Sequence, residues 1–191
     1  MKHSRFHKLA WCICLVLTMA LLLPATALCK TDRLIDSKEY KDKDFHKGII
    51  TDYKDMLEGD RVDWVWVSPS VKLSQFKVKI GSMKNKSDMH GSSRVESIKA
   101  IFKESLADLK GSKGTLTADL CIYEVQGFSP GKAWIPYAGG HQMQAGIGIE
   151  MILRNGSKVV AKFRHFDRQG SDVKDAAHEA ADHLVKYLSK H

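Results

Sequence analysis

Hydrophobic and polar residues alternate in five short segments of the chain, which is the pattern of strands with one buried face. These segments are residues 63–67, 76–80, 116–122, 143–153 and 159–166. Asn155-Gly156 separates the last two, and this dipeptide suits the type I′ turn of a β-hairpin. The pattern therefore predicts five strands, of which the final two form a hairpin.

Two further segments, residues 94–109 and 171–188, place hydrophobic residues at the spacing of an amphipathic helix. Ser92 or Ser93 is positioned to cap the first helix and Ser171 the second. The predicted order is β-β-α-β-β-β-α. It predicts an α+β fold, a two-layer sandwich with both helices on one face of a mostly antiparallel sheet. The first helix is expected to join two parallel strands by a right-handed crossover.

The N-terminus has the three parts of an export signal. Basic residues precede an uncharged stretch at residues 9–23, and Ala25-Thr26-Ala27 fits the site that a signal peptidase reads. A membrane-spanning helix needs about 20 apolar residues, so the length of this stretch disfavours the alternative of an uncleaved anchor. The N-terminus therefore predicts an exported protein.

Three segments are predicted along the chain. They are a signal peptide at residues 1–27, a charged flexible leader at residues 28–47 and a single α+β envelope domain at residues 48–191. Loss of Lys2, Arg5 and Lys8 with the signal lowers the formal net charge from +8 to +5, and the remaining basic residues are spread along the chain. With no recognisable nucleic-acid motif and no later apolar stretch of spanning length, we expect no nucleic-acid partner and no transmembrane helix in the mature chain. Peripheral membrane attachment stays open.

Cys29 and Cys121 are the cysteines that remain after cleavage. A cysteine just after a signal segment suggests lipid attachment, but the lipoprotein pattern has a small residue before the cysteine, and Leu28 occupies that position. Cleavage after Ala27 is therefore preferred, with lipidation of Cys29 as the alternative. In an oxidising compartment Cys29 and Cys121 could form a disulfide, or Cys121 could be a small buried residue of its strand.

Several features resemble uncharacterised bacterial envelope lipoprotein families, namely domains of unknown function of the 4410 and 3313 types. The features are Gly127-Phe128-Ser129-Pro130-Gly131, the alternating strand at residues 145–153, the Asn155-Gly156 hairpin and an Ala-rich C-terminal helix. The resemblance covers residues 48–188. It implies an envelope location and this fold, and it implies no activity. These families carry a clear lipid-attachment cysteine, a pattern from which Leu28 departs.

The histidines form no recognisable catalytic or metal-binding motif. His178 and His183 are five residues apart, which places them about 140° apart around a helix. A zinc-protease helix instead has histidines at i and i+4. His165 could pair with Asp167 or with distant histidines, but nothing in their spacing brings such residues together. The sequence therefore predicts no catalytic residue, no cofactor and no metal ligand.

Gly146, Gly148 and Glu150 share the face of their strand that lies opposite its hydrophobic side chains. Glycine inside a strand indicates the close approach of a helix or another backbone, so a nucleotide-binding loop is not predicted here. Glu150 is expected to be solvated or ion-paired rather than catalytic.

The connection at residues 127–141 is long for a link between two strands. It places Phe128, Trp134, Ile135 and Tyr137 among glycines and prolines. Large rigid side chains in an irregular segment are typical of a partner-binding loop. The other interpretation is that the loop folds back and covers a sheet edge.

Two functions remain open from the sequence. The first is a non-enzymatic protein of the periplasm or outer membrane that binds or scaffolds another envelope protein, or an envelope polymer, through residues 128–141. The alternative is a periplasmic hydrolase or small-ligand-binding protein whose site is not visible in the sequence. Ionisable groups converging in a deep pocket would favour the alternative, and an exposed aromatic loop would favour the first.

Overall fold

The computed structural model describes residues 47–53, 55–128 and 144–191, all within one compact unit that spans residues 34–191. In chain order the elements are β1 (Leu57–Glu58), β2 (Trp64–Val67), the short 3-10 helix η2 (Leu73–Gln75), β3 (Lys77–Asn85), α3 (Ser92–Ala107), β4 (Thr115–Gln126), β5 (Gly146–Asn155), β6 (Lys158–Arg168) and α4 (Val173–Lys190). The predicted signal peptide and almost all of the predicted leader lie outside the described residues. Within the described ranges, no helix combines the length and the apolar character needed to cross a membrane.

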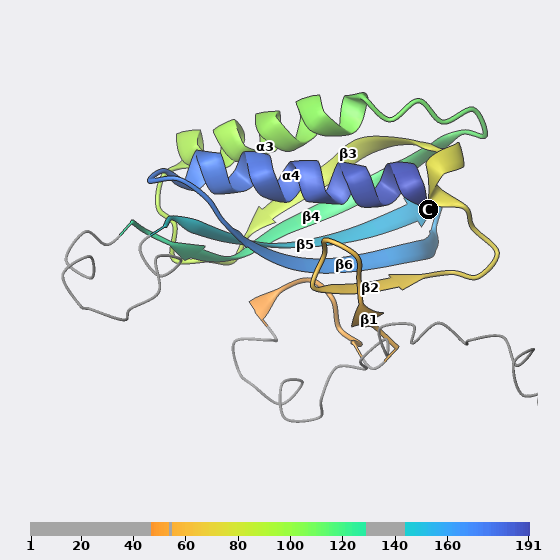
Figure 1. Cartoon of the computed structure of the whole chain (residues 1–191), viewed down its shortest axis with the longest axis horizontal. Coiled ribbons are helices and arrows are strands. Elements are labelled where there is room, and N and C mark those ends of the chain that lie inside the picture. Colours follow the sequence, from red (N-terminus) through yellow and green to blue (C-terminus); the bar gives the residue numbers. More distant parts are fainter. Residues whose placement is uncertain (1–46, 54, 129–143) are drawn as a thin grey trace, which may run out of the picture. The chain divides into compact units, whose positions relative to one another are not determined.

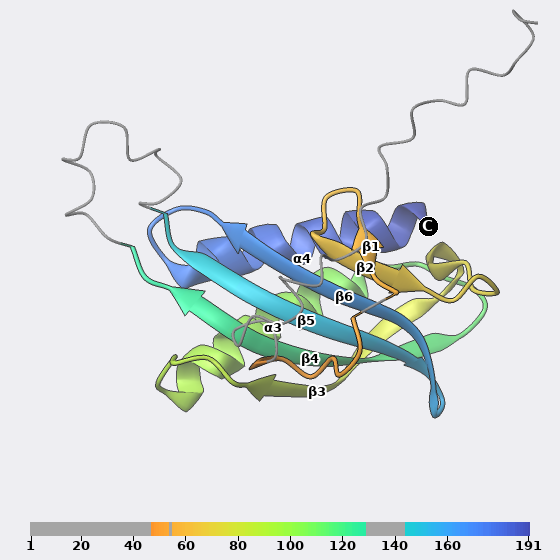
Figure 2. The ribbon, with the colours of Figure 1, turned by 90° about the horizontal axis from the view of Figure 1, so that it is seen from below.

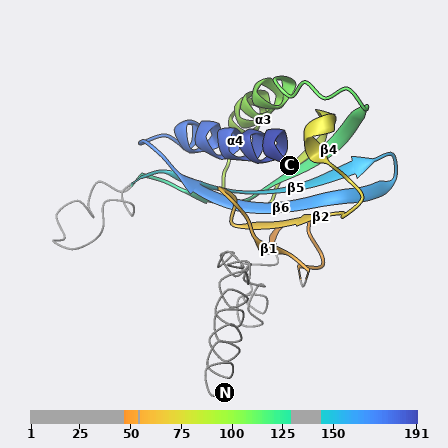
Figure 3. The ribbon, with the colours of Figure 1, turned by 45° about the vertical axis from the view of Figure 1, so that its right-hand side comes forward.

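The strands form one mixed sheet in the order β1-β2-β6-β5-β4-β3. β3 and β4 are parallel, and the other neighbouring strands are antiparallel. α3 joins the parallel pair, because parallel neighbours need a long crossover connection. Both helices lie on the same face of the sheet (Figures 1 and 3), and the view from below looks onto the opposite face (Figure 2).

The expected α+β fold is present as one mixed sheet of six strands with two helices. The sheet also contains the two-residue strand β1, which is too short to show an alternating pattern. The predicted hairpin forms between β5 and β6, with Gly156 at a φ of 60° that glycine adopts at little cost. The helix caps differ from prediction: Asp172 rather than Ser171 caps α4, and α3 has no side-chain cap.

The main core lies between the helices and the sheet. α4 packs against β5 and β6, and α3 packs against β3. The side of α4 that faces the core carries small residues, so the helix approaches the sheet closely. The buried alanines of α4 are Ala176, Ala177, Ala180 and Ala181, and the core side chains of β5 are Ile147, Ile149, Met151 and Leu153.

β5 is buried on both faces over most of its length, although its alternation predicted one buried face. On the face away from the helices, a Cβ on Gly148 would lie 2.5 Å from the Tyr123 ring, and one on Gly146 would lie 2.7 Å from Phe166. The glycines therefore make room for aromatic side chains, rather than for the helix or backbone that they predicted.

Glu150 is fully buried on this second face and pairs with Arg164, whose Nη1 lies 2.6 Å from Oε1. The same carboxylate accepts hydrogen bonds from the backbone N–H groups of Ile49 and Ile50, at 2.5 and 2.8 Å, and from the Tyr53 hydroxyl at 2.5 Å. Of the two expectations for Glu150, the structure shows pairing. Its contacts hold the beginning of the described chain against the sheet.

Arg164 also lies against two aromatic rings. Its guanidinium carbon is 3.7 Å from the centre of the Tyr123 ring and 5.7 Å from that of Tyr53. A cation over an aromatic face gains electrostatic energy that grows when both groups are desolvated. Burial, together with the contact to Glu150, raises the pKa of Tyr53, so its hydroxyl keeps its proton and remains a donor.

We expect Glu150→Gln to destabilise the fold by about 3–5 kcal/mol, because it removes the negative charge that the buried Arg164 guanidinium contacts. Arg154→Gln is the matched control, since the ion pair of Arg154 with Asp119 has side chains that are 35% and 29% exposed. Loss of that pair should cost less than about 1 kcal/mol. Urea unfolding followed by tryptophan fluorescence measures both, and equal losses would contradict the role assigned to Glu150.

Candidate metal centre

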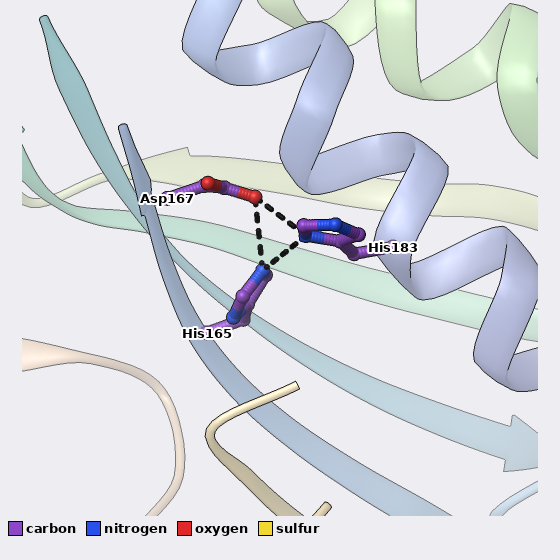
Figure 4. Close-up of side chains that lie close together, drawn as sticks. All are labelled: His165, Asp167 and His183. Carbon is purple, nitrogen blue, oxygen red and sulfur yellow. Dashed lines mark hydrogen bonds and ion pairs between the residues drawn. The ribbon is translucent and has the colours of Figure 1, made fainter. Parts of the chain in front are cut away.

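A strand and a helix bring three side chains together beneath α4. His165 and Asp167 are two residues apart on β6, so strand alternation directs both to the face that α4 covers. His183 comes from α4, on the same helical row as the buried residues Ala180 and Tyr187. Figure 4 shows the three side chains pointing toward one another.

Three potential metal-ligating atoms meet in this group: His165 Nε2, Asp167 Oδ2 and His183 Nδ1. The Asp167 oxygen is 3.2 Å from the His165 nitrogen and 2.7 Å from the His183 nitrogen, and the two nitrogens are 3.3 Å apart. The side chains of His165, Asp167 and His183 are 6%, 13% and 23% exposed. The group is therefore closed on the His165 side and reaches solvent on the His183 side.

Hydrogen bonds alone account for only two of these three contacts. A ring nitrogen either donates or accepts, and an ionised carboxylate only accepts. If His183 Nδ1 donates to Asp167, it has no lone pair for His165 Nε2, so both histidines must donate to one oxygen with their N–H groups side by side. A cation between the three atoms would account for all three contacts, because each atom would then offer it a lone pair.

The outer nitrogen of each histidine faces a further carboxylate. His165 Nδ1 is 3.3 Å from Asp63 Oδ2, and His183 Nε2 is 3.3 Å from Glu179 Oε1. The first contact is at ion-pair distance without hydrogen-bond alignment, so the buried Nδ1 has no well-aligned partner among the described atoms. Carboxylates behind metal-binding histidines fix the ring orientation and raise the basicity of the ligand nitrogen.

Asp63 directly precedes Trp64, and the pair of Trp64 with Arg164 is where the ladder between β2 and β6 ends. Its Oδ2 accepts a hydrogen bond of 2.7 Å from the Phe166 N–H, so the carboxylate continues the ladder in place of a strand residue. Arg61, two residues earlier, has a φ of 67°, the only positive value at a described non-glycine residue. Backbone strain of this kind clusters near functional sites.

Positive charge is favoured at the centre. Burial by itself lowers the pKa of His165, but its contacts with Asp167 and Asp63 outweigh burial and raise the pKa to about 9. Burial by itself raises the pKa of Asp167, but the hydrogen bond and the charge of His165 hold it below its usual value. Without a metal ion, His165 is therefore a cation between carboxylates at neutral pH.

The geometry and chemistry of the three atoms fit a zinc-type ion. Bonds of about 2.0–2.1 Å in a tetrahedral site place neighbouring ligand atoms about 3.3–3.4 Å apart. The separations of 3.2 and 3.3 Å agree with this, and the third, 2.7 Å, needs to open by about half an ångström. Two imidazoles and one carboxylate favour Zn²⁺, Cu²⁺ or Ni²⁺ over Ca²⁺ and Mg²⁺, which prefer oxygen donors alone.

The residues predicted for the partner-binding loop are placed only in part. Phe128 is 47% exposed, the one large hydrophobic residue with such exposure in the described part of the chain. It lines a cavity of about 610 Å³ between the N-terminal turns of α3 and α4, together with Arg94 and Lys174. The other members of the predicted loop, Trp134, Ile135 and Tyr137, lie outside the described residues.

Cys121 is fully buried in β4, and burial raises the pKa of its thiol to about 11. It therefore behaves as a small buried residue of its strand within the described chain. Cys29 lies outside the described residues, so its lipidation and a bridge to Cys121 stay predictions.

The structure brings together His165 and Asp167, the pair that the sequence analysis named, and adds His183. His178 is exposed on α4 and has no part in the group. The sequence analysis paired His183 with His178 of the same helix, whereas the residues that His183 meets, His165 and Asp167, lie on β6. Two signals were available: the His-x-Asp spacing of a strand face, and the place of His183 on the row that leads to Tyr187.

Comparison with known proteins gives little further information. No family model matches the chain, and no curated protein matches it. Two structures of the PelC dodecamer from Paraburkholderia phytofirmans are similar to it, one of them of a single-substitution variant. The variant is 13% identical over 65% of this chain and 94% of that chain, with a TM-score of 0.41. The other is 11% identical over 66% and 93%, with a TM-score of 0.38. This likeness identifies no family, and the resemblance seen in the sequence stays a prediction.

In the protein kept metal-free with EDTA, His165 should make stability depend on pH. Its pKa of about 9 in the fold lies above the ordinary 6.5, so its contribution is fully present below about pH 6.5 and is lost as the pH rises through about 9. We expect the difference in the free energy of unfolding between the unsubstituted chain and the His165→Gln variant to fall by about 2–3 kcal/mol from pH 6.5 to pH 9. Urea titrations at closely spaced pH values measure the difference.

The matched control is His178→Gln, which changes an exposed histidine of α4 outside the group. Its stability should follow that of the unsubstituted chain at every pH. A constant difference for His165→Gln between pH 6.5 and 9 would show that His165 does not titrate as a cation held by carboxylates.

Proposed function

We propose that this chain is an exported envelope protein whose folded domain binds one Zn²⁺ ion, or a similar transition-metal ion, through His165, Asp167 and His183. The supporting observation is the convergence of one ligand atom from each residue at mutual distances of 2.7 to 3.3 Å. In the bound form both histidines are neutral, and their outer nitrogens lie 3.3 Å from the carboxylates of Asp63 and Glu179.

An ion at this position joins β6 to the C-terminal helix. Two of its ligands belong to the strand and the third to α4, which otherwise meets the sheet mainly through apolar side chains. Ligands brought together only by folding couple metal binding to stability. The proposed role is therefore metal binding in the fold itself, rather than on a surface loop.

We expect Zn²⁺ to raise the melting temperature of the chelator-treated protein by about 5–10 °C at a free concentration one hundred times the dissociation constant. Isothermal titration should give a stoichiometry near one. His183→Gln should abolish both effects, because two ligands from one strand cannot replace the third.

His178→Gln is the matched control for this experiment, since it removes an exposed histidine from the same helix and leaves the three ligand atoms in place. It should bind Zn²⁺ as the unsubstituted chain does. Equal binding by the His183→Gln variant would place the metal elsewhere and overturn the proposal. Competition with Mg²⁺ at millimolar concentration should leave Zn²⁺ binding unchanged.

The location in the periplasm or at the outer membrane, and the single-domain two-layer sandwich at residues 48–191, belong to the same proposal. The first is supported by the positive, apolar and small-residue parts of the N-terminus. The second is supported by the placement of α3 and α4 on one face of the sheet (Figure 1). Intact mass of protein recovered from the cell envelope would identify cleavage after Ala27 and any lipid on Cys29.

A second candidate function is partner binding at the end of the sheet where β4 leads into Phe128. The exposure of Phe128 beside a cavity favours it, because a rigid aromatic side chain at the edge of a cavity offers a partner a large contact area. The partner would be another envelope protein, one of the two partner classes, protein or polymer, predicted for residues 128–141. A small ligand in the cavity is the alternative.

A photo-crosslinking amino acid at position 128 in the full chain should give one discrete protein adduct in intact cells. The same probe at Glu104, an exposed position on α3, should give none. Identical adduct patterns from positions 128 and 104, or no adduct from either, would argue against a partner at Phe128.

A further inference from the structure

We propose that the metal ion bound by His165, Asp167 and His183 keeps one open coordination position, and that this position takes a neutral nitrogen donor in preference to an anion. Such a donor has the chemistry of a histidine side chain on a second protein. The inference rests on the metal binding proposed above and adds the class of ligand that the ion accepts.

The first argument is the number of donors. The group contains three metal-ligating side chains among the described residues, and no fourth His, Cys, Asp or Glu joins it there. Zinc sites with a purely structural role have four protein ligands, whereas sites with three protein ligands leave a position for water or another molecule. Three donors therefore indicate an open site.

The second argument is that the two nearest carboxylates are engaged elsewhere. Glu179 faces the outer nitrogen of His183, on the far side of the ring from the ligand atom. Asp63 faces the outer nitrogen of His165 and accepts the Phe166 N–H at 2.7 Å. Either carboxylate would have to leave these contacts to reach the ion, so neither completes the coordination.

The third argument is access. The His165 side chain is 6% exposed, and that of His183 is 23% exposed, so solvent reaches the group from the α4 side. Along β6, pairing with β2 stops at Arg164, and the strand continues through Asp167 without β2 beside it. A side chain from another molecule can therefore approach the ion without displacing a described strand.

The fourth argument is charge. A Zn²⁺ ion with Asp167 and two neutral imidazoles carries a net charge of +1, and Asp63 and Glu179 each add one negative charge close by. The neighbouring lysines of α4 supply no compensating charge, because Lys186 pairs with Asp182 and Lys190 pairs with Asp60. The two flanking carboxylates therefore weaken the attraction of the ion for an incoming anion and leave a neutral donor unaffected.

The test uses the full mature chain loaded with Co²⁺, whose visible spectrum reports the ligands around the ion. Imidazole and azide are titrated separately at constant ionic strength. We expect imidazole to shift the spectrum with saturation and to bind at least about tenfold more tightly than azide. The His183→Gln variant should show neither the initial spectrum nor the shift, which assigns the signal to this centre.

Removal of one flanking charge tests the reason for the preference. Glu179→Gln, loaded with excess Co²⁺ because its metal affinity should be lower, should bind azide about three- to tenfold more tightly. Its affinity for imidazole should change less than about threefold. Glu104→Gln removes an exposed carboxylate of α3 and should alter neither affinity.

Each outcome decides a separate statement. No binding of Co²⁺ to the full chain overturns the proposed metal binding, and this inference with it. A Co²⁺ spectrum that neither imidazole nor azide changes leaves metal binding intact and shows a closed site, which overturns the inference. Azide binding as tightly as imidazole shows an open site without the preference, and overturns the class of ligand assigned here.

Discussion

The buried ion pair between Glu150 and Arg164 is the constraint around which the rest of the sheet is arranged. Two charges taken out of water are stable only when their remaining hydrogen-bonding capacity is met. Here the carboxylate is satisfied by two backbone N–H groups and the Tyr53 hydroxyl, and the guanidinium by aromatic rings. Any other path for the chain before β1 would leave the carboxylate short of donors, so the pair fixes that path.

The next residue along β6 presents the opposite situation on the opposite face. Arg164 and His165 are adjacent, so alternation directs one to each side of the sheet. Arg164 belongs to a network in which its guanidinium, two backbone N–H groups and the Tyr53 hydroxyl all donate to the Glu150 carboxylate. His165 belongs to a group in which its Nε2, an Asp167 oxygen and His183 Nδ1 meet at one point, and hydrogen bonds account for only two of the three contacts. The first arrangement specifies a fold, and the second is suited to receiving a cation.

The fold could largely be predicted from the sequence because its signals are local: alternation, helical spacing and the Asn155-Gly156 turn. The two-residue strand β1 left no such pattern. The cap of α4 is Asp172 instead of its neighbour Ser171, and the pattern does not distinguish between two adjacent capping residues. The candidate metal centre could not be predicted, because His183 meets β6 only through tertiary packing of α4. The burial of Glu150 was hidden for the same reason, since its hydrogen-bond donors come from a segment about one hundred residues earlier.

The contact between Glu150 and the first described residues has a mechanical consequence. Glycine is required at position 48, where a Cβ would lie 1.8 Å from the carboxylate, so the backbone meets the sheet there at very short range. β5 is an interior strand with neighbours on both sides. A force applied to the chain before residue 47 is therefore resisted first by the hydrogen bonds to the Glu150 side chain, and it reaches β1 at the edge of the sheet only after these have broken.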